Sequence, residues 1–362
     1  MDIAIIGLPQ SGKSTVFNAL TAGHSTTTGA GGAGPMRVGV VKVVDPRLAV
    51  LTEIYSPRKT IQAEIQFSDL PPTDRESVNQ LLGGRQRNLL QGTDAMLLVV
   101  RAFSDLGVPH PSGSVDPARD LRAMLAELTL ADLEALERAE GRLADGLKKA
   151  KPAERPALVP QLETVRKVKT ALESGTPVRQ QTLTHSESGA LSDFQLLTSK
   201  PVIVAFNTGE TGPTPALASL GLEPDVTAGL GEVDLSAKLE EDLALMTEEE
   251  ATEFREALGL DEPAIERVKS VCYETVGLVS FLTVGEDEVR AWPVPDGILA
   301  QDAAGTIHSD FSKGFIRAEV IRYEDLVRCG SVAQGRKEGV LRSEGKTYPV
   351  KDGDVINFLI NV

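Results

Sequence analysis

The sequence Gly7-Leu8-Pro9-Gln10-Ser11-Gly12-Lys13-Ser14 fits the pattern G-x-x-x-x-G-K-[ST], in which a glycine-rich turn joins a strand to a helix. An apolar run over residues 2–6 precedes it, and a stretch with helical character follows over residues 13–20. Glycines let successive backbone N–H groups curl toward a polyphosphate, and the N-terminus of the next helix adds positive potential. The segment therefore predicts a phosphate-binding loop that opens an α/β domain.

The residue types in this loop predict how a nucleoside triphosphate is held. The Lys13 side chain is expected to reach the β- and γ-phosphates, and the Ser14 hydroxyl is expected to ligate Mg²⁺. The candidate nucleotide-binding residues of the loop are Gly7, Pro9, Gln10, Ser11, Gly12, Lys13, Ser14 and Thr15.

Further apolar runs predict the rest of the sheet. Residues 38–44, 95–100 and 202–206 are short runs of the kind found in fully buried strands of a parallel sheet. Between the last two, leucines recur at helical spacing over residues 117–172, and Lys151-Pro152 interrupts them. We interpret this region as a long helical hairpin inserted into the α/β domain. Two ordinary surface helices of one compact domain are the alternative.

Composition and charge limit the classes to which the protein can belong. Its 362 residues are enough for two or three domains, and 41% hydrophobic with 25% charged residues is ordinary globular composition. A formal net charge of −15 excludes nonspecific nucleic-acid binding through bulk positive charge. The chain has two cysteines, no apolar run long enough to span a membrane and no secretory signal at its start. We therefore expect a cytoplasmic protein without a membrane or DNA partner.

A second set of candidate residues follows the strand expected at residues 202–206. Guanine-specific proteins of this class use Asn-Lys-x-Asp there, whereas this chain has Asn207-Thr208-Gly209-Glu210. Glutamate adds a methylene and the lysine is absent, so we expect relaxed purine selectivity rather than strict GTP selectivity. Ser236-Ala237-Lys238 is similar to the last base-binding loop of such proteins, with an ordinary helix cap as the alternative.

Two other patterns carry no functional prediction. The glycine-rich segment 29–34 matches G-x-G-x-x-G, but it follows no expected strand and opens no expected helix, so a loop is favoured over a dinucleotide site. His308-Ser309-Asp310 contains the residue types of a catalytic triad, but consecutive side chains cannot converge as nucleophile, base and orienting group. We interpret His308 to Asp310 as structural.

With these segments in view, the chain resembles the YchF family of Obg-like ATPases, P-loop NTPases of the translation-factor class. The resemblance runs over nearly the whole chain and is densest in residues 281–292, 304–311, 314–320, 344–346 and 352–355. It implies a split G domain, a helical coiled-coil insertion, a C-terminal β-grasp (TGS, ubiquitin-like) domain, ribosome binding and a purine preference that favours ATP. Residues 311–351 contain nine basic and five acidic residues, so we expect salt-sensitive contact with the ribosome or ribosomal RNA there.

The chain departs from the family pattern at three places. Relatives carry Pro-Asn-Val-Gly-Lys-Ser in the loop, where this chain has Gln10 instead of the asparagine that helps to place a monovalent cation. In switch I, residues 29–35 replace Pro-Phe-Thr-Thr-Ile, which leaves Thr26 to Thr28 as candidate metal contacts. In switch II, Asp-x-x-Gly becomes Asp69-Leu70-Pro71-Pro72, and a proline has no N–H to donate and a fixed φ angle. The motif still implies that Asp69 contacts Mg²⁺ through a water molecule, which makes it the second candidate metal contact beside Ser14.

The resemblance also implies a catalytic histidine. In the family, a histidine on a loop after the strand that ends in Val-Val-Arg is the proposed substitute for the missing water-orienting glutamine. His110 occupies that position here, and a loop histidine without a role is the alternative. His110 and Lys13 are therefore the candidate catalytic residues.

Together these observations predict an α/β fold with three parts. A P-loop NTPase (G-protein-like) domain is split between residues 1–116 and 190–278, a helical hairpin occupies residues 117–189, and a β-grasp TGS domain occupies residues 279–362. The predicted function is binding and slow hydrolysis of ATP, or GTP, with Mg²⁺, and association with the ribosome or ribosomal RNA through the TGS domain and the helical insertion. The alternatives are a nonhydrolytic nucleotide-binding adaptor and an RNA- or protein-interaction protein with a vestigial G domain.

Overall fold

The computed structural model describes residues 1–28, 36–71, 81–210, 214–260 and 262–361, and the chain divides into two compact units. The first unit comprises Met1–Val40 and Gln66–Thr275, and the second comprises Val41–Ile65 and Val276–Val362. The segment 41–65 therefore groups with the C-terminal residues, whereas the division predicted from the sequence assigned it to the first domain. The glycine-rich residues 29–35 and Pro72 lie outside the described residues.

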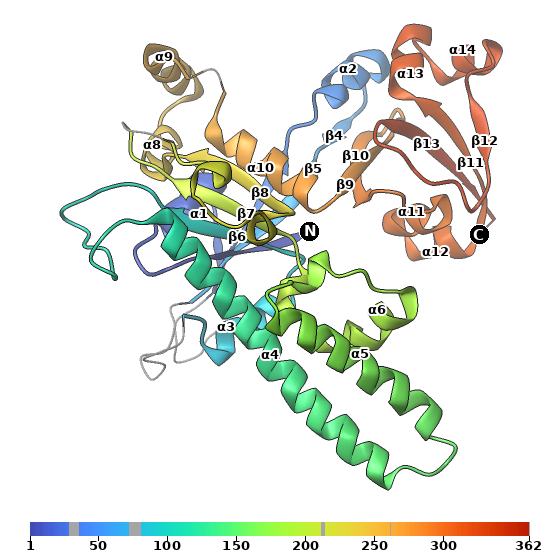
Figure 1. Cartoon of the computed structure of the whole chain (residues 1–362). Coiled ribbons are helices and arrows are strands. Elements are labelled where there is room, and N and C mark those ends of the chain that lie inside the picture. Colours follow the sequence, from blue (N-terminus) through green and yellow to red (C-terminus); the bar gives the residue numbers. More distant parts are fainter. Residues whose placement is uncertain (29–35, 72–80, 211–213, 261, 362) are drawn as a thin grey trace. The chain divides into compact units, whose positions relative to one another are not determined.

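The first unit is built on a seven-stranded sheet with the order β2-β3-β5-β1-β6-β7-β8 (Figure 1). Its parallel strands are β5 (Ala63–Asp69), β1 (Asp2–Ile6), β6 (Ala95–Arg101), β7 (Val202–Asn207) and β8 (Leu230–Leu235). Every residue of β6 and β7 is buried, as expected for continuous apolar runs with a helix layer on each face. This confirms the strands predicted at residues 2–6, 95–100 and 202–206.

The prediction of a fully buried parallel strand at residues 38–44 is wrong. This strand, β3 (Met36–Val43), pairs antiparallel with β2 (Thr26–Thr28), and the Val40 side chain is 56% exposed. Strands in antiparallel pairs often keep one face in water, so β-branched residues alone do not show that both faces are covered.

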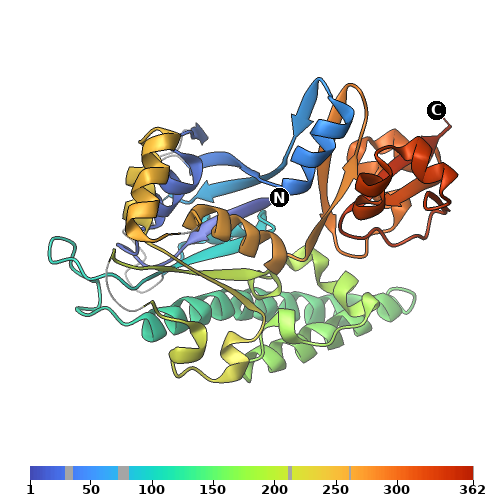
Figure 2. The same cartoon turned by 90° about the horizontal axis from the view of Figure 1, so that it is seen from above.

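Helices cover both faces of the first sheet (Figure 2). α1 (Lys13–Thr21) and α10 (Ala264–Thr275) lie on one face, and α3 (Gly84–Gln91) and the start of α4 (Pro117–Lys149) lie on the other. The shorter helices of this unit are α6 (His185–Leu191), α7 (Pro224–Thr227), α8 (Ala237–Leu243), α9 (Glu248–Leu258) and the 3-10 turns η1 (Val178–Gln180), η2 (Ser192–Phe194), η3 (Leu197–Ser199) and η4 (Leu217–Ser219).

α4 and α5 (Arg155–Glu173) form the predicted hairpin, which projects from the first unit in Figure 1. Asp116 caps α4 by accepting a hydrogen bond from the Arg119 N–H, and α4 ends just before Lys151-Pro152. The second half of α4 packs against α5 through buried Leu136, Val165 and Val168. The first half packs on the sheet, so α4 is at once a core helix and one arm of the hairpin. None of the described helices is long and apolar enough to cross a membrane.

The second unit is built on a six-stranded sheet with the order β12-β11-β13-β9-β10-β4. Its strands are β4 (Lys59–Ile61), β9 (Leu278–Thr283), β10 (Glu288–Pro295), β11 (Phe315–Arg322), β12 (Arg342–Glu344) and β13 (Asp354–Ile360). Its helices are α2 (Pro46–Tyr55), α11 (Ala300–Ile307), α12 (Ser309–Lys313), α13 (Tyr323–Cys329) and α14 (Val332–Lys337). β4 pairs with β10, which explains why residues 41–65 belong to this unit.

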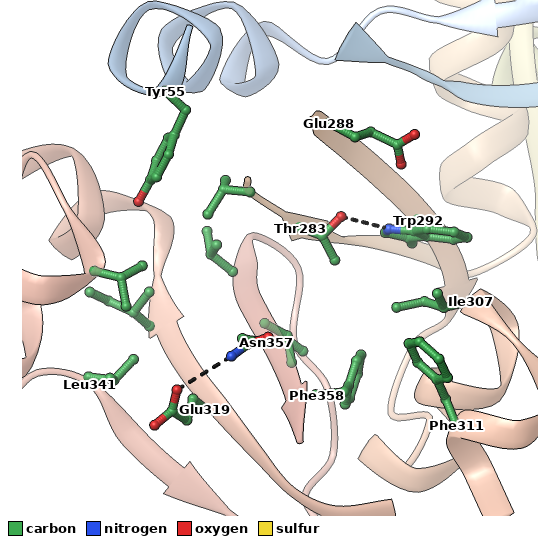
Figure 3. Close-up of a pocket in the computed structure, with 15 residues that line it drawn as sticks. Tyr55, Thr283, Glu288, Trp292, Ile307, Phe311, Glu319, Leu341, Asn357 and Phe358 are labelled. Atoms are coloured by element: carbon green, nitrogen blue, oxygen red, sulfur yellow. Dashed lines mark hydrogen bonds between the residues drawn. The ribbon is translucent and has the colours of Figure 1, made fainter. Parts of the chain in front are cut away.

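This second unit contains a cavity of about 530 Å³ lined largely by apolar and aromatic side chains (Figure 3). Four of its polar side chains form two hydrogen-bonded pairs: the Trp292 indole N–H donates to Thr283, and the Asn357 amide donates to Glu319. Nearby, the His308 ring accepts from the Asp310 N–H and caps α12, which agrees with the structural interpretation of His308 to Asp310.

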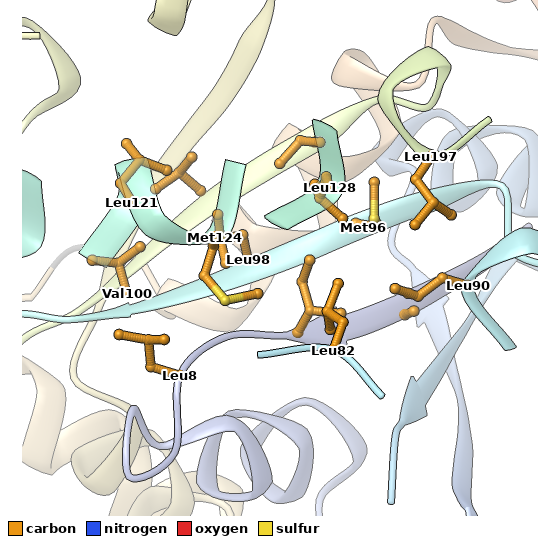
Figure 4. Packing of buried hydrophobic residues seen from close by; sticks show 14 of the residues in the cluster. Leu8, Leu82, Leu90, Met96, Leu98, Val100, Leu121, Met124, Leu128 and Leu197 are labelled. Carbon is orange, nitrogen blue, oxygen red and sulfur yellow. The ribbon is translucent and has the colours of Figure 1, made fainter. Parts of the chain in front are cut away.

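The buried core of the first unit anchors the phosphate loop (Figure 4). Leu8, the second residue of the loop, is buried in a cluster that contains residues of β6, α3 and α4. Members of this cluster include Leu90, Met96, Leu98, Leu121 and Met124. One apolar side chain of the loop is thus fixed in the core, while the polar residues that follow it lie at the carboxyl end of β1.

Candidate nucleotide-binding site

Two neighbouring pockets of the first unit gather most of the predicted nucleotide-binding residues. A pocket of about 450 Å³ is lined by the predicted residues Gly7, Pro9, Lys13, Ser14 and Asp69. A pocket of about 730 Å³ is lined by the predicted residues Gln10, Gly12, Thr15, Asn207, Glu210, Ser236 and Lys238. The two remaining predicted residues, Ser11 and Ala237, are buried. Segments more than 200 residues apart in the sequence therefore meet at one edge of the sheet, where parallel strands end.

The two glycines of the loop have conformations that other residues rarely adopt. Gly7 has φ of 149° and Gly12 has φ of 92°. A Cβ on Gly7 would lie 2.4 Å from the Val99 carbonyl oxygen, and a Cβ on Gly12 would lie 2.1 Å from the Asn207 amide nitrogen. Gln10 between them also has a positive φ, 61°, a conformation that asparagine tolerates better than glutamine does. The loop therefore requires glycine at its two ends.

Lys13 lies partly buried beneath the loop. Its ammonium donates hydrogen bonds to the carbonyl oxygens of Gly7 (2.9 Å) and Leu8 (2.7 Å). Burial lowers the pKa of Lys13 from 10.5 to about 8, and the nearby Asp69 carboxylate offsets part of this effect. The ammonium is thus bonded to the start of the loop, and it loses its proton at a lower pH than an exposed lysine does.

The two predicted metal contacts lie side by side. The Ser14 hydroxyl donates to the Asp69 carboxylate over 3.1 Å, and the Arg37 guanidinium lies 3.6 Å from the same carboxylate. Burial raises the pKa of Asp69, while Ser14, Arg37 and Lys13 act in the opposite direction.

This donor set fits Mg²⁺. The ion takes oxygen ligands and commonly binds one or two protein oxygens, with water and phosphate completing its shell. The described residues contain no group of three or more His, Cys, Asp and Glu side chains that could hold a metal by themselves. A hydroxyl and one carboxylate beside a phosphate loop therefore suit a metal that arrives with a nucleotide.

Asn207 connects the two ends of the site. Its amide group donates to the Ser11 carbonyl oxygen over 3.0 Å and accepts from the Ala237 N–H over 3.1 Å. The side chain is thus engaged in holding the phosphate loop against the loop that contains Ser236 and Ala237. Glu210 lines the larger pocket, and the Lys238 ammonium pairs with Asp242 at 2.8 Å.

His110 is not among the residues that line the two pockets. Its side chain is 3% exposed, its Nε2 lies 2.8 Å from a carboxylate oxygen of Asp120, and its Nδ1 accepts from the Ser112 N–H. These bonds tie the loop to the first turn of α4. In the switch I region, Thr26 to Thr28 form β2, paired with β3, and the rest of that segment lies outside the described residues.

Sequence reasoning missed Arg37 and Phe103. Arg37 contacts the ring of Phe17 as well as Asp69, and Phe103 lines the larger pocket under the Arg101 guanidinium. Phe103 is the second residue after β6, and a residue in that position of a parallel sheet is expected at the ligand-binding edge. No comparable signal marks Arg37, because its place depends on the pairing of β3.

Comparisons with known proteins agree with this geometry. A family model described as "50S ribosome-binding GTPase" matches residues 2–131, and a model for the YchF GTPase C-terminus, described as a protein of unknown function, matches residues 278–361. A Bacillus subtilis protein named ribosome-binding ATPase YchF is 38% identical over 99% of this chain and 98% of its own length. A protein of the same name from Escherichia coli O157:H7 is 39% identical over 99% of this chain and 98% of its own length.

The fold agrees as well. The solved structure of the Schizosaccharomyces pombe YchF GTPase matches with a TM-score of 0.81 and 28% identity, over 99% of this chain and 97% of that chain. The α/β fold is that of a P-loop GTPase-like protein. Sequence identity and fold thus agree over nearly the full length, and the chain belongs to the YchF family.

Proposed function

We propose that the protein binds ATP, or less tightly GTP, with Mg²⁺, hydrolyses it slowly to the diphosphate and phosphate, and associates with the ribosome in the cytoplasm. The observation that carries this proposal is the pair of pockets around the phosphate loop, which are lined by residues of the loop, by Asp69, and by residues of the segments 207–210 and 236–238. The names of the relatives, which describe ribosome-binding ATPases, support it.

Each part of the site has a proposed role. The loop N–H groups and Lys13 bind the β- and γ-phosphates, and Ser14 with Asp69 would hold Mg²⁺, which neutralises phosphate charge when bound. Glu210 and the Ser236–Lys238 loop contact the base. Asn207 holds the phosphate loop and the base loop together through its two hydrogen bonds. Because Glu210 stands where an aspartate would recognise guanine, the site favours ATP.

Calorimetric titration of the nucleotide-stripped protein with ATP and GTP, with and without Mg²⁺, tests this proposal. We expect tighter binding of ATP than of GTP, a requirement for Mg²⁺, and loss of binding in Lys13→Ala. Lys149→Ala, an exposed lysine at the end of α4, is the matched control and should bind as the wild type does. Unchanged binding and turnover in Lys13→Ala would show that the loop has been misassigned.

The position of His110 favours a second candidate function, nucleotide binding without appreciable hydrolysis. The side chain is buried, bonded to Asp120, and outside both pockets, so the proposed catalytic role requires the loop to move. Steady-state turnover separates the two functions. Many turnovers per site that fall at least tenfold in His110→Ala, with ATP affinity unchanged, support hydrolysis through His110. An ATP-binding protein with no turnover in the wild type supports the adaptor.

The ribosome contact is proposed to involve the C-terminal unit and the helical hairpin. Of the nine basic residues in the segment 311–351, four make ion pairs within the described residues. The other five make none there, and they are Arg317, Arg322, Lys337, Lys346 and Lys351. Basic side chains without acidic partners are available to phosphates of RNA, so we propose ribosomal RNA as the surface that these residues contact.

A further inference from the structure

A smaller pocket of about 190 Å³ lies in the first unit, at the base of the helical hairpin. It shares no lining residue with the two pockets around the phosphate loop. α4 contributes Arg122 and Thr129, the turn η1 and the residue before it contribute Arg179 and Pro177, η3 contributes Thr198, and α7 contributes Val226. No residue assigned a role in nucleotide or ribosome binding belongs to it.

The pocket contains two positive charges and no negative one. No Asp or Glu lines it, and neither Arg122 nor Arg179 makes an ion pair with any described residue. The Arg179 Nε atom is buried and donates to no partner in the described parts of the chain. The residues one helical turn from Arg122, which are Ala118, Arg119, Leu125 and Ala126, include no acid. Arg122 is exposed, so the buried Arg179 Nε is the group that lacks compensation here. In a chain with net charge −15, this Nε beside a second arginine without an acidic partner indicates a site for an external anion.

The walls of the pocket are held by hydrogen bonds. The Thr198 hydroxyl donates to Asp132 of α4 over 2.7 Å and accepts from the Val178 N–H. The Gln180 amide donates to the carbonyl oxygens of Asp225 and Ala228, each over 2.9 Å. Arg179 lies between Val178 and Gln180, so its backbone is fixed against both α4 and the α7 segment.

The pocket offers donors of one kind only. The Thr198 hydroxyl proton is engaged with Asp132, and the Thr129 hydroxyl donates to the Leu125 carbonyl oxygen over 3.1 Å. The guanidinium groups are therefore the free donors, and a guanidinium cannot accept a hydrogen bond. Partial burial also lowers the pKa of Arg179. The ligand must be an acceptor and must be negatively charged.

We propose that this pocket binds a phosphate group, with Arg122 and Arg179 as its ligands. A phosphate near pH 7 carries roughly −1.5 to −2 charges and matches two guanidiniums, whose planar forks donate pairs of hydrogen bonds to phosphate oxygens. The volume is below the roughly 300 Å³ at which pockets for drug-sized ligands begin, so the pocket takes a phosphate group rather than a whole nucleotide. The group comes either from inorganic phosphate or from the backbone of RNA.

The test uses the full chain with the phosphate loop disabled by Lys13→Ala, so that its outcome does not depend on the proposed ATP site. Inorganic phosphate is titrated calorimetrically at constant ionic strength into this parent and into Arg122→Met and Arg179→Met, which keep the apolar stems. Arg142→Met, at an exposed arginine further along α4, is the matched control. We expect saturable binding in the parent and in the control, weakened at least tenfold in both pocket variants.

Urea unfolding without phosphate separates loss of the site from loss of the fold. Because Arg179→Met removes a partly buried charge whose Nε lacks a partner, the variant should be at least as stable as the parent in phosphate-free buffer. Added phosphate should then stabilise the parent but not the variant. Binding of inorganic phosphate and of the oligonucleotide described next that is equally tight in the parent and in both pocket variants would overturn the proposal.

Anisotropy of a labelled twelve-nucleotide oligouridylate distinguishes the source of the phosphate. Weaker oligonucleotide binding in Arg122→Met and Arg179→Met, but not in Arg142→Met, identifies the RNA backbone. Unchanged oligonucleotide binding with loss of inorganic phosphate binding identifies free phosphate. If neither probe depends on the two arginines, the pocket binds no phosphate group and the proposal fails.

Discussion

At the scale of single residues, the Lys13 ammonium links nucleotide binding to pH. Its pKa is lowered to about 8 mainly by burial, so the side chain loses its charge as the pH rises through 8. Bound phosphates favour the charged form, and ATP binding above pH 8 therefore takes up a proton. We expect ATP affinity to fall by up to roughly tenfold per pH unit above 8 and to change little between pH 7 and 8.

Calorimetry in two buffers of different ionisation enthalpy measures this proton uptake directly. At pH 9 the uptake should approach one proton per ATP, and at pH 7 it should be close to zero. The lowered pKa of Lys13 also makes the free energy of unfolding depend on pH. Between pH 8 and 10.5 the unfolded chain binds more protons at Lys13 than the folded chain, so this residue makes the free energy of unfolding rise with pH. Equal proton uptake at both pH values would contradict the prediction.

Gly12→Ala tests the close packing of the phosphate loop. The new Cβ would lie 2.1 Å from the Asn207 amide nitrogen at a φ of 92°, and moving Asn207 breaks its bonds to Ser11 and Ala237. We expect a loss of about 2–4 kcal/mol in the free energy of unfolding, from backbone strain and two buried hydrogen bonds, together with loss of ATP binding. Urea unfolding and ATP titration measure the two effects. A stable Gly12→Ala protein that binds ATP would show that the loop is not packed in this way.

At the scale of elements, the outer part of α4 contains glycines that the fold does not require. Gly141 is helical, and a Cβ placed on it would meet no atom within 4 Å. We expect Gly141→Ala to stabilise the hairpin by about 0.5–1 kcal/mol, because alanine loses less backbone freedom on folding. Hydrogen exchange of α4 amides beyond Leu136 measures the effect locally. Gly12→Ala is the contrasting variant, because it is expected to lower the free energy of unfolding whereas Gly141→Ala is expected to raise it. A destabilised Gly141→Ala protein would show that the hairpin needs glycine at this position.

The buried contacts of α4 also explain why hairpin and sheet are joined firmly. Asp132, one turn beyond the sheet-packed segment, accepts hydrogen bonds from Leu197 N–H, Thr198 N–H and the Thr198 hydroxyl. These three bonds connect α4 to the segment that leads into β7. The domain boundaries that we propose assign all of α4 to the hairpin, although its first half packs in the core of the first unit. The hairpin is therefore an extension of the first unit rather than an appended module.

At the scale of the whole molecule, charge is divided unequally between the two units. The segments 41–65 and 276–362 contain 14 basic and 16 acidic residues, and the rest of the chain contains 23 basic and 36 acidic residues. The acidic excess thus belongs almost entirely to the first unit. RNA contact is expected where the basic residues are locally in excess and unpaired, and it is expected to weaken with salt.

Two sets of charge-neutralising exchanges test this distribution. The first exchanges Arg317, Arg322, Lys337, Lys346 and Lys351 for glutamine, and the second exchanges Lys148, Lys149, Lys151 and Arg155 at the tip of the hairpin. We expect each set to weaken ribosome cosedimentation and to reduce its dependence on salt, with a slope lowered by roughly 0.7–0.9 for each phosphate that is no longer neutralised. Unchanged cosedimentation in both sets would refute the proposed ribosome contacts.

Truncation is a poorer test of the same surface. A chain that ends at Thr275 keeps residues 41–65 but deprives β4 of its partner β10 and α2 of the sheet on which it packs. We expect such a fragment to unfold at a lower temperature than the full chain, as measured by calorimetry. Weak ribosome binding by a truncated protein would then reflect partial unfolding as well as the missing basic residues, whereas the glutamine sets keep both units intact.

Local patterns were sufficient for much of this protein. Strand, glycine-rich loop and helix follow one another within 21 residues, and the geometry of such a turn depends on short-range constraints that glycine and the periodicity of apolar residues express directly. The hairpin was predictable for the same reason, because helical spacing of leucines and the Lys151-Pro152 interruption are local signals. The segments 7–15, 207–210 and 236–238 also carry local signals of this kind, whereas their spatial relation does not follow from them.

Only the tertiary structure decided what depends on contacts between distant segments. The pairing of β4 with β10 placed residues 41–65 in the second unit, and antiparallel pairing with β2 left one side of β3 in water. The same is true of Asn207, which bonds to two loops, and of His110, which is buried against Asp120. A sequence specifies the periodicity and turns of each element by itself, whereas burial and hydrogen-bond partners arise from residues that are brought together only when the chain folds.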